Sequence, residues 1–265
     1  MYTNKKLNWL RITTAAIAIC AVGPIQAEGK KVWASGEAGI LSMSPIGSAG
    51  DGLSMPTGAI ELGVHLKNSP YSISFGMRRF SDSDSEETQY SSEQEGSEVY
   101  TYENSNAVSG TVLDFEVGRD VQLGGNSTGR VTLGVRNFDV ENRNEYSYTG
   151  SYSTDTRFEG TGPRIALETS TPVSEKLSLD VEAGLAVLFG STTITTGSDG
   201  DVYSIYTQDN TVKNLDFSAA LSYLIAPKAK ISIGVRADIF SGLTQGYDDS
   251  KISTTGAFLK FTTEF

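Results

Sequence analysis

The stretch LSLDVEAGLAVLF, Leu177–Phe189, decides the fold class. Its odd-numbered residues are apolar, whereas its even-numbered residues include Asp180, Glu182 and Gly184. Successive side chains of a β-strand point to opposite faces of the sheet. This period of two therefore predicts a strand with one apolar and one polar face.

Nine further segments of the chain show the same alternation. In Leu215–Tyr223, for example, the odd-numbered residues are apolar, and Asp216 and Ser218 lie on the other face. The remaining segments are Val32–Ile40, Ile60–Leu66, Tyr71–Arg78, Leu113–Gly118, Val131–Arg136, Arg164–Glu168, Ile231–Ile239 and Gly256–Phe265. The sequence thus predicts an all-β protein of about ten two-faced strands.

The segments that connect these strands alternate in length. Short connections are expected around 68–69, 120–128, 171–176 and 226–228, and long ones around 41–57, 81–107, 142–157, 192–211 and 242–254. Short periplasmic turns, long outer loops and an even strand number are typical of outer-membrane barrels. A soluble β-sandwich is the alternative. We expect a transmembrane antiparallel up-and-down barrel over residues 28–265, because closure pairs every backbone group in hydrocarbon.

Composition excludes several other classes. The 265 residues carry a net charge of −11 with no basic stripe, which argues against nucleic-acid binding. The single Cys excludes a disulfide framework. Beyond residue 27, no apolar run approaches the roughly 20 residues that a membrane-spanning helix needs.

Residues 1–27 have the order of a secretory signal peptide. Lys5, Lys6 and Arg11 precede the apolar stretch Ile12–Val22, and cleavage is expected between Ala27 and Glu28. An uncleaved anchor is the alternative, but the apolar run is short. Cys20 could indicate a lipoprotein, although Ile19 stands before it where a small residue would be expected.

The chain ends on an aromatic residue inside its last predicted strand. Phe265 is the final residue, and Phe261 lies four residues earlier. We predict that both form the signal by which the barrel-assembly machinery inserts the chain. Lipid and lipopolysaccharide of the outer membrane are the other expected contacts.

Charged residues of the polar face should point into the lumen, and acids outnumber bases there. The expected pore-lining residues are Glu37, Glu61, Arg78, Asp114, Glu116, Arg136, Arg164, Glu168, Asp180, Glu182, Asp216, Arg236, Asp238 and Lys260, to which Arg130 and Glu264 add. One interpretation is a plug of ion pairs, because a narrow barrel is filled by side chains. The other is a small channel whose acidic excess attracts cations. A carboxylate-pair hydrolase is a weaker alternative.

His65 is the only histidine, which limits the enzymes that the chain could be. It lies at the periplasmic end of the second predicted strand, away from the outer rim. No second histidine is present for a relay, and the mature chain lacks the His and Cys residues of a typical zinc site. We therefore expect no enzyme activity, metal or cofactor.

The segment 81–107 is strongly acidic. It holds no Lys or Arg, and its acids are Asp82, Asp84, Glu86, Glu87, Glu93, Glu95, Glu98 and Glu103. Such a composition favours a solvated extracellular loop. Divalent cation binding and surface contact through Tyr90, Tyr100 and Tyr102 are the alternatives.

Several motifs resemble one known family. FEGTGPR at Phe158–Arg164 is the most distinctive, with LDFEVGR at Leu113–Arg119 and VTLGVRNF at Val131–Phe138 before it and Leu177–Gly190 after it. Over residues 110–265, this order is similar to the Legionella-type major outer membrane protein family of pore-forming barrels. The resemblance implies a porin-like barrel that passes small solutes or ions. A non-conducting barrel that acts in surface interaction through its acidic loops is the alternative.

Overall fold

The computed structural model describes residues 31–44, 53–91, 99–147, 150–243 and 251–265. The proposed signal peptide and its cleavage site at Ala27 and Glu28 lie outside these residues. Ten strands form the described chain: β1 (Lys31–Ser44), β2 (Leu53–His65), β3 (Tyr71–Ser91), β4 (Val99–Gln122), β5 (Thr128–Ser147), β6 (Ser151–Pro172), β7 (Leu177–Ser198), β8 (Asp201–Ala226), β9 (Ala229–Ser241) and β10 (Lys251–Glu264). None of the described residues forms a helix that could cross a membrane.

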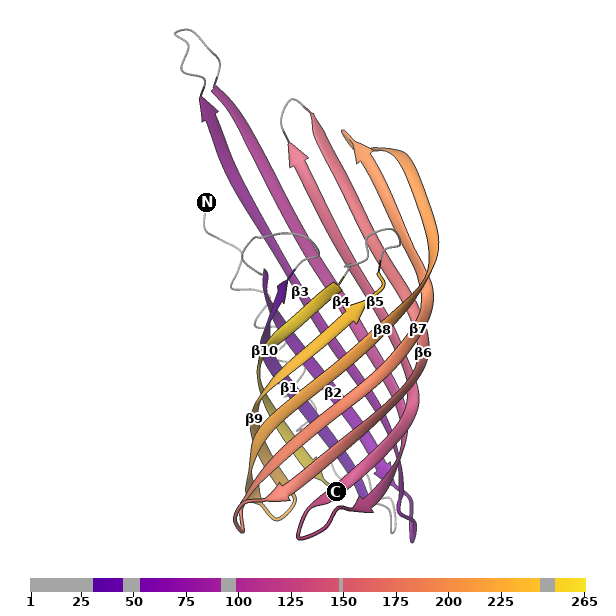
Figure 1. Ribbon diagram of the computed structural model, residues 1–265. Helices are drawn as coiled ribbons and strands as arrows, with labels where there is room; N and C mark the ends of the chain where they lie inside the picture. The colour runs from indigo at the N-terminus through magenta and orange to yellow at the C-terminus, as the bar shows by residue number, and fades with distance from the viewer. Residues whose placement is uncertain (1–30, 45–52, 92–98, 148–149, 244–250) are drawn as a thin grey trace.

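The strands close into an up-and-down barrel (Figure 1). Every strand pairs antiparallel with its neighbours in sequence, and β1 closes the ring on β10 through pairs such as Glu37↔Lys260. Phe265 extends this closure, since its backbone N–H donates to the carbonyl oxygen of Val32 at 2.8 Å. The predicted fold class is confirmed.

The outer face of the barrel carries an apolar belt. Leu185, Ile233 and Leu133 are 57%, 65% and 61% exposed, and each lies next in sequence to a residue that faces the interior. Leucine, isoleucine, valine and phenylalanine at equivalent positions of the other strands continue the belt. Such a surface is stable against hydrocarbon rather than water, so the apolar face of each strand is the membrane face.

The two ends of the barrel differ, as Figure 1 shows. At one end, hereafter the inner end, short turns join the strands. There Asn68 adopts a φ of 56° within the turn between β2 and β3. At the other end, the outer end, the hairpins β3–β4, β5–β6 and β7–β8 rise beyond the remaining strands.

These hairpins correct the expectation of long irregular loops. Most of the segment 81–107 is strand, because β3 continues to Ser91 and β4 begins at Val99. The segments 142–157 and 192–211 are likewise mostly strand, within β5 to β8. At the tip of β7–β8, Asp199 and Gly200 have φ values of 53° and 89°, the conformation of a tight hairpin turn.

Candidate functional site: the barrel interior

The interior of the barrel is organised in layers along its axis. On β5, Arg130 lies toward the inner end, Arg136 in the middle and Phe138 toward the outer end. On β9 the same order holds for Lys230, Arg236 and Phe240. The alternation of each strand places these side chains on its interior face. From the inner end to the outer end, the interior therefore holds a charged cavity, hereafter the vestibule, then a layer of ion pairs, and then a layer of apolar side chains.

Arg164 of β6 is the centre of the ion-pair layer. Its guanidinium pairs with Glu116 of β4, with Glu182 of β7 at 2.9 Å and with Asp216 of β8 at 2.5 Å. Arg164 is only 4% exposed. Because three strands supply its partners, the network joins separate parts of the barrel wall.

Arg136 of β5 extends the same network. It binds both oxygens of Asp114 on the neighbouring strand, at 2.7 and 2.8 Å. Its Nη1 donates to Asp216 at 2.8 Å and to Asn214, both on β8. Asp216 thus accepts from both Arg136 and Arg164, so a single carboxylate holds the two guanidinium groups together.

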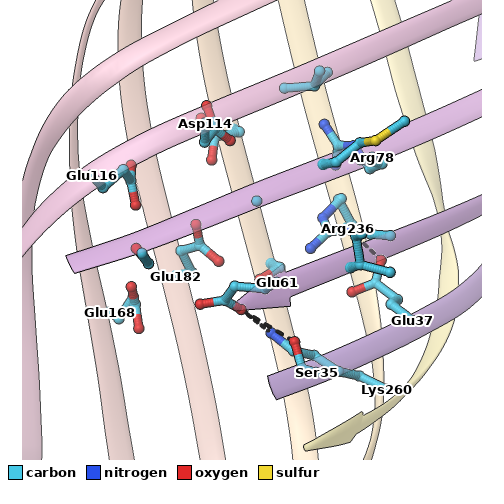
Figure 2. Close-up of a pocket in the computed structure, with 18 of the residues that line it drawn as sticks. Ser35, Glu37, Glu61, Arg78, Asp114, Glu116, Glu168, Glu182, Arg236 and Lys260 are labelled. Atoms are coloured by element: carbon cyan, nitrogen blue, oxygen red, sulfur yellow. Dashed lines mark hydrogen bonds and ion pairs between the residues drawn. The ribbon is translucent and has the colours of Figure 1, made fainter. Parts of the chain in front are cut away.

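Three further ion pairs cross between non-adjacent strands on the other side of the interior. Arg78 of β3 donates to Asp238 of β9 at 2.9 Å. Arg236 of β9 pairs with Glu37 of β1, and Lys260 of β10 with Glu61 of β2 at 3.0 Å. Figure 2 shows the last two pairs projecting into the same cavity as Glu116, Glu168 and Glu182. This cavity has a volume of about 130 Å³.

An apolar layer fills the interior on the outer side of the ion pairs. The rings of Phe138 on β5 and Phe240 on β9 stack with centroids 4.1 Å apart, although three strands separate β5 from β9. Phe158 lies beside Phe138, and the other members are Leu41, Met43, Met55, Phe80, Val108, Val112, Val140, Ala186, Leu188, Val212 and Leu243. The stacked rings therefore bridge the lumen from wall to wall.

A cavity of about 590 Å³ occupies the inner end. Its lining includes Glu61, Glu168, Asp180, Lys230 and Lys260. Lys230 pairs with Asp180 at 2.8 Å. This vestibule reaches the ends of the strands at Gln122 and Glu264, so its charged walls lie near the periplasmic turns.

His65 lies in this vestibule, at the inner end as expected. Its Nδ1 faces Asp120 at 3.4 Å, and its Nε2 faces Nη2 of Arg130 at 3.3 Å. Trp33 packs against both the His65 ring and the Arg130 guanidinium. With a guanidinium at Nε2 rather than a hydroxyl or thiol, this arrangement is not that of a nucleophile and its base.

The structure places all the predicted pore-lining charges on the interior side of the barrel, in two groups. The middle group is Glu37, Arg78, Asp114, Glu116, Arg136, Arg164, Glu182, Asp216, Arg236 and Asp238; the group nearer the inner end is Glu61, Arg130, Glu168, Asp180, Lys260 and Glu264. Phe261, a predicted assembly residue, lies on β10 opposite Gly36. Sequence reasoning missed Lys230 and Asn214, and it missed the apolar layer altogether. The sequence did contain a signal for the three phenylalanines of this layer. Phe138, Phe158 and Phe240 are even-numbered, as are the interior charges on the same strands, so alternation places them on the interior face.

Comparisons with known proteins agree with the resemblance seen in the motifs. The family model described as the Legionella pneumophila major outer membrane protein precursor matches residues 56–237, more than half of the chain. The match begins well before residue 110, where the motif resemblance was expected to start, and it ends before β10. Comparison with the curated proteins gave no match.

The chain also matches several solved outer-membrane structures, each with a TM-score below 0.5. The outer membrane protease OmpT of Escherichia coli is 9% identical, with 92% of this chain and 99% of that chain covered and a TM-score of 0.49. A major outer membrane protein of Thermus thermophilus is 11% identical, with coverage of 90% and 100% and a TM-score of 0.41. An outer membrane channel of Pseudomonas putida is 9% identical, with coverage of 92% and 100% and a TM-score of 0.38.

The family match, the closed ring of strands and the outward apolar belt lead to one assignment. The chain belongs to the Legionella pneumophila major outer membrane protein family and is a ten-stranded β-barrel of the bacterial outer membrane.

Proposed function

We propose that this barrel is closed to solutes and acts through the sheet that its hairpins raise above the membrane. The observation that carries the proposal is the stack of Phe138 on Phe240 across the lumen. The ion-pair layer around Arg164 and Arg136 lies next to this stack, on the side of the inner end. A solute would have to separate both layers to pass.

The energetics of the two layers support this reading. Opening the apolar layer would expose side chains that are almost fully buried, such as Leu188 and Val212. Opening the ion-pair layer would leave buried charges without partners, which is strongly unfavourable. The layers therefore stabilise the barrel as well as obstruct it.

A solute-flux measurement tests the proposal. Proteoliposomes that contain the refolded barrel are diluted into an iso-osmotic solution of a small sugar, and swelling is followed by light scattering. We expect the swelling rate to equal that of liposomes without protein. Swelling that increases with the amount of folded barrel would contradict a closed lumen.

A narrow, cation-preferring pore is the second candidate, and the inner vestibule is the observation that favours it. The cavity of about 590 Å³ is lined by more acids than bases, including Glu61, Glu168 and Asp180. If an open path existed, its acidic walls would favour cations. The preference would weaken at high salt, because the Debye length falls from about 10 Å at 0.1 M to about 3 Å at 1 M. A reversal potential under a salt gradient would report it.

We further propose that the chain is not an enzyme. His65 supports this, since it lies at the inner end with both ring nitrogens facing charged partners, Asp120 and Arg130. The absence of proteolytic and lipolytic activity in the refolded barrel is the expected outcome. Hydrolysis that survives replacement of His65 by Ala would point to another site.

A further inference from the structure

The outer half of β8 lies at an edge of the raised sheet. β8 pairs with β7 from Asp201 down to Tyr223, but its pairing with β9 begins only at Lys213 opposite Ser241. Within the described residues, the segment Asp201–Asp209 therefore has a neighbour on one side only, whereas Asn210 and Thr211 are contacted by Leu243 and Gly242. Figure 1 shows this segment rising in the β7–β8 hairpin, above the end of β9.

The part of β8 that pairs with β9 shows which backbone groups of the strand face the open side. A Cβ on Gly234 of β9 would stand 2.5 Å from the carbonyl oxygen of Ala219, and one on Gly242 would stand 2.6 Å from that of Thr211. Between Ser204 and Tyr223, where β8 has no register shift, the odd-numbered residues thus direct their carbonyls to the β9 side. In an antiparallel strand the N–H of the same residue points the same way. Ile205, Thr207 and Asp209 consequently present N–H and C=O groups to the open side.

The side chains of the same segment are unusually apolar for an exposed edge. Val202, Tyr203, Ile205 and Tyr206 are 60%, 67%, 67% and 55% exposed. Natural edges are commonly protected by Lys or Pro, and Asp201–Asp209 contains neither. An open edge with exposed apolar side chains is the surface to which a further strand adds, with main-chain bonds giving affinity and side chains giving specificity.

We propose that Asp201–Asp209 is a docking edge for an extended basic segment of another polypeptide, which binds as an added antiparallel strand. The proposal deepens the surface role proposed above and rests on it. The charge of the edge selects the partner, because Asp199, Asp201 and Asp209 are exposed and the segment holds no Lys or Arg before Lys213. The net charge of −11 adds a field that attracts a basic partner.

A second copy of this chain fits the edge less well. Two copies in one membrane share their orientation, so the two β8 strands would run in the same direction and could not pair antiparallel. The β3 segment from Ser81 to Ser91 runs the opposite way, and beyond Phe80 no strand of the described residues pairs with its second side. Its sequence, however, holds Asp82, Asp84, Glu86 and Glu87 and no base, which would bring like charges to Asp201 and Asp209.

The test uses the full refolded barrel in detergent and a fluorescent peptide of alternating Val and Lys. Fluorescence anisotropy measures binding, and a Val–Glu peptide of equal length is the charge control. We expect saturable binding of the Val–Lys peptide that weakens with salt, and none of the Val–Glu peptide. The variants Ile205→Pro and Ile205→Thr form a matched pair. Both remove the isoleucine side chain, but only proline removes the N–H that faces the open side.

The Ile205→Pro variant should bind the Val–Lys peptide roughly tenfold more weakly than Ile205→Thr, as expected for loss of the edge hydrogen bonding. Heat-modifiable migration must show that both variants are folded. Equal affinity of the two variants, equal binding of both peptides, or self-association of the barrel in light scattering would each overturn the proposal.

Solute flux is measured on the same preparations. A barrel that conducts yet binds the peptide refutes only the closed lumen, whereas a closed barrel that does not bind refutes only the docking edge.

Discussion

Arg164 and Arg157 lie on the same strand but in opposite environments, which makes them a matched pair. Arg164 is buried among Glu116, Glu182 and Asp216, whereas Arg157 lies near the outer end of β6, where its side chain points away from the interior and is half-exposed beside Asp139. The hydrogen bonds and charge of Asp139 raise the pKa of Arg157 above its ordinary value. An arginine guanidinium stays protonated in proteins, so both side chains are charged and only their surroundings differ.

Replacement of Arg164 by Ala should lower the free energy of unfolding by about 3–5 kcal/mol, because it leaves buried carboxylates without a partner. Replacement of Arg157 by Ala should lower it by no more than about 1 kcal/mol, as for exposed ion pairs. Reversible urea unfolding in lipid vesicles measures both values. Adding Asp216→Asn to the Arg164 variant should restore part of the loss. Equal losses for the two arginines would show that the network is not buried as described.

The facing of individual residues gives a second prediction. An Arg at Leu185 or Ile233, which are exposed on the membrane face, should cost roughly 2–4 kcal/mol near the bilayer midplane. An Arg at Ser218, which lines the interior between Glu182 and Arg236, should cost much less. The same unfolding assay compares them. A similar cost at both faces would mean that the interior and exterior have been exchanged.

Sequence alternation could predict which charges face the interior, but not which partners they meet. The pairing of Arg164 with Glu116 depends on how neighbouring strands are staggered, and that of Lys260 with Glu61 depends on closure of the ring. Phe138 and Phe240 illustrate the opposite failure. Their even numbering is that of the interior face, but both lie just beyond the alternating segments Val131–Arg136 and Ile231–Ile239, from which the facing was predicted.

At the scale of the strand, the hairpin tip of β7–β8 shows what local sequence could have revealed. Asp-Gly is the pair favoured at a two-residue hairpin turn, and it occurs at Asp199-Gly200. The segment 192–211 could therefore have been predicted as a hairpin. No comparable turn pair marks the end of β3, so its continuation to Ser91 was harder to foresee.

The turn itself gives a third prediction. Gly200 has a φ of 89°, and a Cβ there would meet no atom within 4 Å, so only backbone strain opposes a side chain. Gly200→Val should destabilise the hairpin by about 1–3 kcal/mol. Gly200→Asn should be tolerated better, since Asn enters the left-handed region more readily. Limited proteolysis of the folded barrel reports opening of the hairpin. Equal protection of the two variants would argue against the tight turn.

The last strand gives a fourth prediction, which concerns assembly. Phe265 continues the pairing of β10 with β1, because its backbone N–H donates to the carbonyl oxygen of Val32. Deletion of Phe265 should reduce the heat-modifiable folded band in outer membranes, and Phe265→Tyr should retain it. Because both β10 and β1 take part in closure, an effect is expected on insertion rather than on synthesis. Unchanged assembly after the deletion would remove Phe265 from the proposed signal.

At the scale of the whole molecule, closure of the ring explains both the fold and the contacts between side chains of opposite walls. Ten strands leave a lumen that side chains from opposite walls can cross, as Phe138 and Phe240 do. The strand number was predictable from the repeated alternation. The sequence could not predict whether the polar faces enclose water or pair with one another. That outcome depends on the width of the lumen and the lengths of the side chains.

Single-channel recording in a planar bilayer tests the closed lumen most directly. The wild type and a variant that combines Phe138→Ala, Phe240→Ala and Arg164→Ala are compared at equal amounts of inserted, heat-modifiable barrel. We predict that the wild type passes no steady current, whereas the variant conducts because both layers that cross its lumen are weakened. A steady ohmic current through the wild-type barrel would contradict the account.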